Sequence, residues 1–120
     1  MTVDGMGVDL VEIRRIQEID ANKLANRILS TQEKTLYNQK KLAAQKTEFL
    51  ASRFAAKEAY TKAYQSFDTA LNMSDVSVLN SETGAPYIDS PYRKQDKILL
   101  SLSHTKNYIV AVCIIEKVKV

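Results

Sequence analysis

The chain has 120 residues, of which 45% are apolar and 26% charged, so it suits one globular domain spanning residues 1–120 and leaves no room for separate catalytic and substrate domains. Its formal net charge is only +3, and it carries no recognised nucleic-acid motif, which argues against a nucleic-acid-binding domain. A domain this short buries a smaller share of its surface than a large one, so a deep cleft is more easily built between subunits than within one.

The sequence contains no apolar run that approaches the roughly 20 residues needed to cross a bilayer. Its first residues also lack the basic and then apolar pattern of a signal peptide. The single cysteine, Cys113, cannot form an intramolecular disulfide and lies in the apolar run 109–115, where we expect a buried, inert thiol. We therefore expect a soluble, unprocessed cytoplasmic protein that does not contact a membrane.

The first half of the chain has strong local signals. Residues 2–13 are β-branched and interrupted by glycines, which predicts a strand that gives way to helical spacing over residues 14–19. Residues 30–33 have the spacing of a capping box and predict the start of a short helix that runs through Tyr37. Residues 42–64 contain no glycine or proline, are rich in alanine and repeat apolar side chains every three or four positions, which predicts a long central helix.

The second half changes to short β-rich segments separated by turn residues. The predicted strands cover residues 75–79, 86–88, 98–103 and 108–115, with turns at 82–85 and 104–107. Helices gathered in the first half and antiparallel strands in the second predict an α+β fold in which the first strand joins the later sheet.

Two segments could together form a cation site. Asp9 emerges from an otherwise apolar strand just after Gly7, whose missing side chain permits close approach of another backbone or a ligand. Phe54, Glu58 and Lys62 follow at four-residue steps and therefore share one stripe of the predicted helix. Two carboxylates with few other protein ligands suit Mg²⁺, which completes its shell with waters and substrate phosphates. Lys62 could then neutralise phosphate charge.

Each of these groups also has a structural interpretation. Asp9 could cap the turn that follows it, and Glu58 with Lys62 is a common solvent-exposed helix pair worth a few tenths of a kcal/mol. For His104, the only histidine, a hydrogen-bonded structural role at a turn competes with a role as base or phosphate contact. Four basic side chains lie on the early helices, at Arg14, Arg15, Lys23 and Arg27. They could form a solvated surface or dock an acidic partner.

Taken in order, several segments resemble the signature of the holo-acyl-carrier-protein synthases, which are small phosphopantetheinyl transferases. These segments are the run GMGVDLVEIRRI at 5–16, the run RFAAKEA at 53–59 with Lys62 and Ala63, the turn 84–86, and the run SLSHT at 101–105 with Tyr108. Together they span essentially the whole chain. Their order and spacing are specific, although each segment alone is a weak signal.

The resemblance implies a long central helix packed on an antiparallel sheet and a homotrimer with its site at the subunit interfaces. It also implies transfer of 4′-phosphopantetheine from coenzyme A to a serine of an apo acyl carrier protein, with release of adenosine 3′,5′-bisphosphate, in fatty acid biosynthesis. Asp9 and Glu58 match the family's two Mg²⁺ ligands, and Lys62 matches a lysine that contacts the phosphates. The serine proton could pass to Glu58 or to a metal-held water.

The same resemblance assigns further binding residues. Those implied to bind coenzyme A are Arg53, Phe54, Lys62, Gly84, Pro86, His104 and Thr105. Arg14, and more loosely Arg15, Lys23 and Arg27, match the basic early helix that receives the acidic helix of the carrier protein.

One segment departs from the family pattern. After Lys62 and Ala63 the family usually has a glycine-rich loop, whereas residues 64–70 read YQSFDTA and contain no glycine. This departure keeps a second class of function open, a non-catalytic trimeric module that retains the fold and the anion cleft and binds carrier proteins or nucleotides without turnover.

Overall fold

A computed structural model describes residues 2–64, 71–92 and 95–117 of the chain. The elements of the first half are strand β1 (Thr2–Glu12) and helices α1 (Ile13–Gln17), α2 (Ala21–Ile28), α3 (Thr31–Gln39) and α4 (Ala43–Tyr64). Those of the second half are the 3-10 helix η1 (Met73–Asp75) and strands β2 (Ser77–Asn80), β3 (Pro86–Asp89), β4 (Lys97–His104) and β5 (Tyr108–Lys117). The predicted α+β arrangement is confirmed. Residues 65–70, most of the glycine-poor segment, lie outside the described residues.

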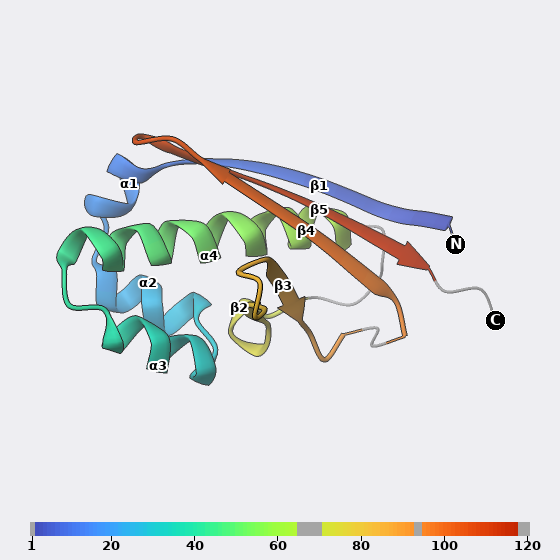
Figure 1. The fold of residues 1–120 in the computed structure, drawn as a ribbon, viewed down its shortest axis with the longest axis horizontal. Helices are drawn as coiled ribbons and strands as arrows, with labels where there is room; N and C mark the ends of the chain where they lie inside the picture. Colours follow the sequence, from blue (N-terminus) through green and yellow to red (C-terminus); the bar gives the residue numbers. More distant parts are fainter. Residues whose placement is uncertain (1, 65–70, 93–94, 118–120) are drawn as a thin grey trace.

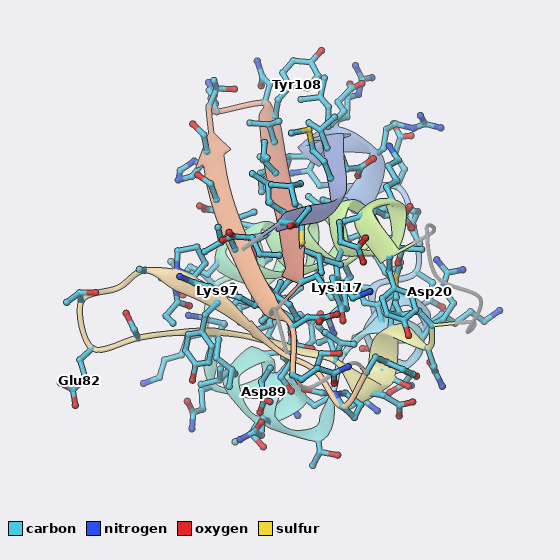
Figure 2. The ribbon with its side chains drawn as sticks, turned by 90° about the vertical axis from the view of Figure 1, so that its right-hand side faces the viewer. Asp20, Glu82, Asp89, Lys97, Tyr108 and Lys117 are labelled. Carbon is cyan, nitrogen blue, oxygen red and sulfur yellow. The ribbon has the colours of Figure 1, made fainter. Side chains whose placement is uncertain are left out.

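The strands form two antiparallel sheets. β1, β5 and β4 pair in that order, so the first strand joins the later sheet, as predicted, and lies beside the last strand, while β2 and β3 form a separate hairpin. Helix α4 lies between the three-stranded sheet and a second layer made of α2, α3 and the hairpin (Figure 1). Figure 2 shows the β2–β3 hairpin projecting from the side of the molecule with Glu82 at its tip.

Local capping sets where helices α2 and α3 begin. Asp20 accepts hydrogen bonds from the amides of Asn22 and Lys23 at the start of α2. Ser30 and Glu33 form the predicted capping box at the start of α3. Several predicted boundaries differ from the observed ones by one or two residues. β4 continues through His104 and shortens the predicted turn, and the segment predicted as a strand from residue 75 begins with η1, so that β2 starts at residue 77.

Helix α4 is buried around much of its circumference because structure packs on both sides of it. Small side chains let the neighbouring layers approach closely, and Ala51, Ala55, Ala56 and Ala59 are all completely buried. α4 also contains a buried lysine, Lys57, which the sequence analysis did not single out. No helix among the described residues is long and apolar enough to cross a membrane.

The buried lysine belongs to an ion pair that ties several elements together. The Nζ of Lys57 donates to the Glu33 carboxylate and to the carbonyl oxygens of Ile28 and Met73. The other Glu33 oxygen accepts the amide of Val78 at 2.7 Å. Both charged side chains are completely buried, so burial lowers the pKa of Lys57 while Glu33 opposes that shift. Because the ammonium has three acceptors, its burial is compatible with a stable fold.

The three-stranded sheet carries apolar side chains on both of its faces. Its inner face packs on α4 and includes Cys113, which is completely buried as predicted, and burial raises the pKa of this thiol to about 12. On its outer face, Met6, Val8 and Leu10 of β1 are 67%, 54% and 65% exposed. These residues pair with Ile114, Val112 and Val110 of β5. A contiguous exposed apolar surface of this kind is typical of an interaction site.

Candidate active site

Strand β1 makes a very close approach to helix α4 at Gly7. A Cβ atom added there would lie 2.0 Å from the carbonyl oxygen of Ala59 and 2.8 Å from the amide nitrogen of Ala63. Glycine at this position therefore serves the approach of another backbone, one of the two roles that the sequence suggested for it. Because side chains alternate along a strand, Asp9 lies on the same inward face as Gly7 and is brought against α4.

The ammonium group of Lys62 on α4 binds to β1. Its Nζ donates to Oδ1 of Asp9 at 3.1 Å and to the carbonyl oxygen of Val8 at 3.0 Å. The Asp9 side chain is 17% exposed and that of Lys62 is 47% exposed. Asp9 lies inside β1, and α1 begins only after Glu12, so the alternative in which Asp9 caps the next turn is wrong. Lys62 instead joins two elements that are far apart in the sequence.

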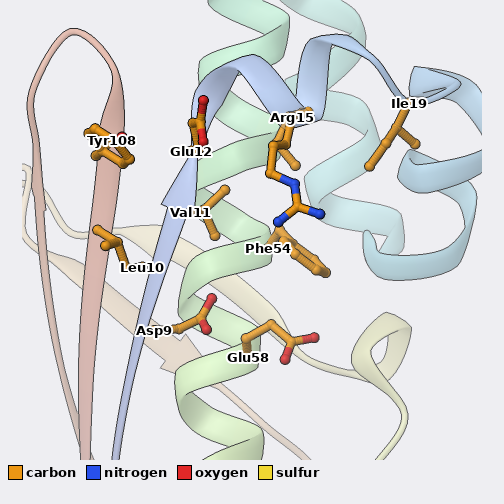
Figure 3. Close-up of a pocket in the computed structure, with 10 residues that line it drawn as sticks. Asp9, Leu10, Val11, Glu12, Arg15, Ile19, Phe54, Glu58 and Tyr108 are labelled. Carbon is orange, nitrogen blue, oxygen red and sulfur yellow. The ribbon is translucent and has the colours of Figure 1, made fainter.

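The second carboxylate, Glu58, lies close enough to Asp9 for their charges to interact. Burial raises the pKa of the Glu58 carboxyl, and the negative charge of Asp9 raises it further, while Lys62 and Arg27 oppose the shift. Figure 3 shows the carboxylates of Asp9 and Glu58 on the same side of α4. The two groups therefore repel each other in a partly desolvated space.

This pair of carboxylates fits Mg²⁺. Among residues 2–64, 71–92 and 95–117, no group of three or more His, Cys, Asp and Glu side chains could enclose a metal ion. Mg²⁺ does not need such an enclosure, because it is commonly held by one or two carboxylates together with waters and substrate phosphates. The repulsion between Asp9 and Glu58 is the unfavourable interaction that a cation would offset.

Both carboxylates open into a hollow of about 520 Å³ that is lined by β1, α1 and α4. In Figure 3, Arg15 of α1 reaches across this hollow toward Phe54 of α4. Ile19 and Tyr108 add exposed apolar surface to the lining. We name this the carboxylate hollow. Its combination of acidic, cationic and apolar walls suits a ligand that has both phosphate and apolar parts.

Other predicted coenzyme-binding residues line a second hollow of about 470 Å³, which we name the arginine hollow. The predicted residues in it are Arg53, Gly84, Pro86 and His104. Gly84 has a φ of +88° at the tip of the β2–β3 hairpin, a conformation that favours glycine. His104 is exposed and lies 3.7 Å from a carboxylate oxygen of Glu48.

The guanidinium of Arg53 is held rigidly in the arginine hollow. It stacks on the ring of Phe49, with 4.0 Å between Cζ and the ring centroid. Its terminal nitrogens donate to Ser52 Oγ and to Asn80 Oδ1, each at 3.1 Å. Its Nε is buried without a hydrogen-bond partner among the described residues. Burial lowers the pKa of Arg53, and Glu33 opposes the shift. The hollow therefore presents a preformed cation, which suits an anion.

Five of the seven predicted coenzyme-binding residues thus divide between two hollows of one chain, while Lys62 and Thr105 are not among the residues that line either hollow. Phe54 lies in the carboxylate hollow and Arg53 in the arginine hollow, because consecutive positions on a helix point about 100° apart. Thr105 organises the β4–β5 turn, where its Oγ1 accepts the amides of Asn107 and Tyr108.

The four basic residues of the early helices differ in their surroundings. Arg14 is highly exposed and lies 3.6 Å from Glu18, while Arg15 borders the carboxylate hollow. Lys23 and Arg27 line an adjacent surface hollow, of which Ile19 forms part. Ile19, 48% exposed, borders both hollows and was missed by the sequence analysis. An apolar side chain among basic ones is the only sequence signal that could have identified it.

Comparison with known proteins gives one family. The family model of the 4′-phosphopantetheinyl transferase superfamily matches residues 5–113. The holo-(acyl-carrier-protein) synthase of Lactococcus lactis subsp. cremoris is 42% identical over 118 residues, covering 96% of this chain and 98% of that protein. The corresponding enzyme of Acholeplasma laidlawii is 35% identical over 114 residues, with 95% and 97% covered.

Comparison of the structure with solved structures indicates the same family. The crystal structure of a holo-(acyl-carrier-protein) synthase from Bacillus anthracis in complex with CoA (3′,5′-ADP) has a TM-score of 0.87 and 33% identity, and the match covers 98% of this chain and all of that one (100%). The enzyme of Neisseria meningitidis matches with a TM-score of 0.84 and 25% identity over 97% of this chain and 100% of that chain. The chain therefore belongs to the 4′-phosphopantetheinyl transferase superfamily, among its holo-acyl-carrier-protein synthases.

Proposed function

We propose that this protein transfers 4′-phosphopantetheine from coenzyme A to a serine hydroxyl of an apo acyl carrier protein and releases adenosine 3′,5′-bisphosphate, in fatty acid biosynthesis. The observation that carries the proposal is that β1 and α4 bring Asp9 and Glu58 together on one hollow, with the ammonium of Lys62 bound to Asp9. The names of the relatives and the ligand bound to the Bacillus anthracis enzyme support it. The reaction draws on coenzyme A and a carrier protein, so we place it in the cytoplasm.

The residues have distinct parts in this reaction. Asp9 and Glu58 would hold Mg²⁺, which when bound would neutralise charge on the pyrophosphate and make the phosphorus more electrophilic. Lys62 is half exposed, so its ammonium can reach a phosphate oxygen and stabilise the charge that develops on the departing bisphosphate. A bond forms between the serine oxygen and the phosphorus while the bond from that phosphorus to the bridging oxygen breaks. The serine proton would pass to the Glu58 carboxylate or to a metal-held water.

We further propose that the protein acts as a homotrimer in which coenzyme A binds between subunits. Five of the seven predicted coenzyme-binding residues line two separate hollows of one chain, so one ligand would use the carboxylate hollow of one subunit and the arginine hollow of its neighbour. The exposed outer face around Met6, Val8 and Leu10 provides apolar surface for the association.

The carrier protein would dock beside the carboxylate hollow. Arg14, Arg15, Lys23 and Arg27 offer positive charge to an acidic helix. Exposed Ile19 lies among them and would supply an apolar contact at the centre of the docking surface. This arrangement would bring the carrier's serine to the hollow that holds the carboxylates.

A direct test is to measure release of adenosine 3′,5′-bisphosphate by chromatography after incubation with coenzyme A, Mg²⁺ and apo acyl carrier protein. The expected result is one bisphosphate released per carrier, and none when the carrier's acceptor serine is replaced by alanine. Binding of coenzyme A without release would favour the non-catalytic module.

A further inference from the structure

We propose that Gly7 is a positioning residue of the active site, whose contact with α4 sets the distance from Asp9 to Glu58 and Lys62 and thereby the affinity of the site for a divalent cation. This deepens the proposed function and rests on it, because Asp9 and Glu58 are its metal ligands. Gly7 itself touches neither coenzyme nor carrier in this account.

The contact lies next to the functional side chains along both elements. Gly7 and Asp9 are two residues apart on the inner face of β1, about 7 Å along the strand. On α4, the touching atoms belong to Ala59 and Ala63, which directly follow Glu58 and Lys62 in the chain. Only one peptide unit on the helix, and two on the strand, separate the backbone contact from the side chains of the site.

The backbone contact between Gly7 and α4 cannot accommodate a larger residue through a small local adjustment. The atoms that would meet a Cβ at Gly7 are backbone atoms of a helix whose residues here are completely or almost completely buried. Real Cβ atoms essentially never come within 3.0 Å of such neighbours, against the 2.0 Å found here, so β1 must shift by about 1 Å. The functional side chains of an active site must be held within about 0.5 Å of their productive positions.

The shift acts directly on contacts between the two elements. Lys62 Nζ reaches Asp9 Oδ1 at 3.1 Å and the Val8 carbonyl at 3.0 Å, so a shift of about 1 Å carries both beyond the usual range of a hydrogen bond. Moving β1 away from α4 lengthens both contacts. It also separates Asp9 from Glu58, so that the two carboxylates no longer match a single cation.

The test is to measure Mn²⁺ binding to Gly7→Ala by titration calorimetry and, in parallel, its Mg²⁺ dependence in the transfer assay. Mn²⁺ binding should weaken at least about tenfold, the loss typical of a changed supporting shell. The Mg²⁺ concentration for half-maximal rate should rise more than the maximal rate falls. The control is Ile115→Ala, which creates a cavity in the same core at a buried position of β5. It should lower the melting temperature and leave the Mn²⁺ affinity unchanged.

Two further variants distinguish an altered distance between Asp9 and Glu58 from a general loss of stability. Asp9→Glu lengthens the carboxylate arm, so it should weaken Mn²⁺ binding in the parent protein and restore part of it in Gly7→Ala. Ala59→Gly should not rescue Gly7→Ala, because the obstructing atom of Ala59 is its backbone oxygen. If Gly7→Ala does not fold, Asp9→Glu alone still tests the spacing.

Parent-like Mn²⁺ affinity in Gly7→Ala would overturn the proposal, as would rescue by Ala59→Gly or undiminished Mn²⁺ binding by Asp9→Glu alone. Failure of the proposed function looks different. In that case the parent binds Mn²⁺ in a manner that depends on Gly7 but transfers nothing to the carrier, and the positioning role stands.

Discussion

The ammonium of Lys62 lies 3.1 Å from a carboxylate oxygen of Asp9, a residue 53 positions earlier in the chain. This contact joins α4 to β1 at the edge of the carboxylate hollow. Glu58 and Lys62 have the ordinary spacing of an exposed helix pair. They become part of a site because Asp9 of β1 adds a third charged group beside them.

Replacing this lysine should reduce turnover far more than binding. Lys62→Met removes the group that stabilises charge on the leaving bisphosphate, so we expect the maximal rate to fall about 10²- to 10³-fold, as when one such donor is lost elsewhere. The matched control is Lys106→Met, which removes the same charge from an exposed turn. Steady-state kinetics measure both. A Lys62→Met rate close to that of the control would contradict the assigned role.

Glu58→Gln should increase stability at neutral pH while it abolishes transfer. The pKa of Glu58 is raised above its ordinary value of 4.5, chiefly by burial and next by Asp9. The folded protein therefore binds this proton more tightly than the unfolded chain, and that contribution to stability is lost as pH rises through the folded pKa. Glutamine keeps the shape without the charge.

Melting temperatures measured from pH 4 to pH 8 check the sign of this effect. The advantage of Glu58→Gln over the parent should appear as pH rises and persist at neutral pH. A variant less stable than the parent at neutral pH would show that the ionised carboxylate is not strained. In the metal-free site the same raised pKa makes protons compete with Mg²⁺ at a higher pH than for an ordinary carboxyl, so transfer at limiting Mg²⁺ should decline early on acidification.

Lys57→Met should destabilise the fold strongly. The substitution leaves the buried Glu33 carboxylate without its cation, and breaking a buried pair in this way costs about 3–5 kcal/mol. Lys41→Met, at an exposed position just before α4, serves as the control and should change stability by less than about 0.5 kcal/mol. Urea unfolding measures both values. Similar stabilities for the two variants would mean that the buried pair contributes little.

The outer face of the three-stranded sheet should hold the assembly together. Val112 lies at the centre of that face, paired with Val8 and Ser101. Val112→Asp would place a charge there, and we expect it to give monomers and lose transfer activity. Leu42→Asp alters another exposed apolar residue, away from the sheet, and should do neither. Light scattering after gel filtration reports the mass, and an intact trimer of Val112→Asp would contradict the proposed interface.

A site shared between subunits predicts complementation. Glu58→Gln disables the carboxylate hollow and Arg53→Gln the arginine hollow, so each variant alone should be inactive. In randomly mixed trimers, about a quarter of the interfaces would pair two intact hollows and recover activity in proportion. Co-expression with different purification tags isolates the mixed species. Absence of recovery in verified mixed trimers would mean that each chain carries a complete site.

Local signals in the sequence predicted much of the fold. The capping box at Ser30 and Glu33, and the alanine-rich helix that became α4, depend on residues close together in the chain. The entry of β1 into the later sheet followed from the general pattern of an α+β fold, whereas its pairing with β5 in particular was not predicted. The boundary at His104 was missed because β4 is extended by its pairing with Ile109, which local turn propensity does not contain.

The sequence was enough to predict which charged residues belong to the site, but not which contacts they make. Gly7, Asp9 and Glu58 stood out because a glycine and two carboxylates are unusual in their surroundings. The ion pair of Lys62 with Asp9 depends on how β1 packs on α4, and the burial of Lys57 depends on acceptors from three other elements. Neither is encoded in short-range spacing, which would place both lysines in solvent.

The central claim is tested most directly by intact-mass spectrometry of a purified apo acyl carrier protein after incubation with this protein, coenzyme A and Mg²⁺. Parallel samples contain a metal chelator or the Asp9→Asn variant. We predict that the carrier gains the mass of one phosphopantetheine group in the complete mixture and gains nothing in either control. An unmodified carrier in the complete mixture, while a known transferase modifies the same preparation, would contradict the assigned activity.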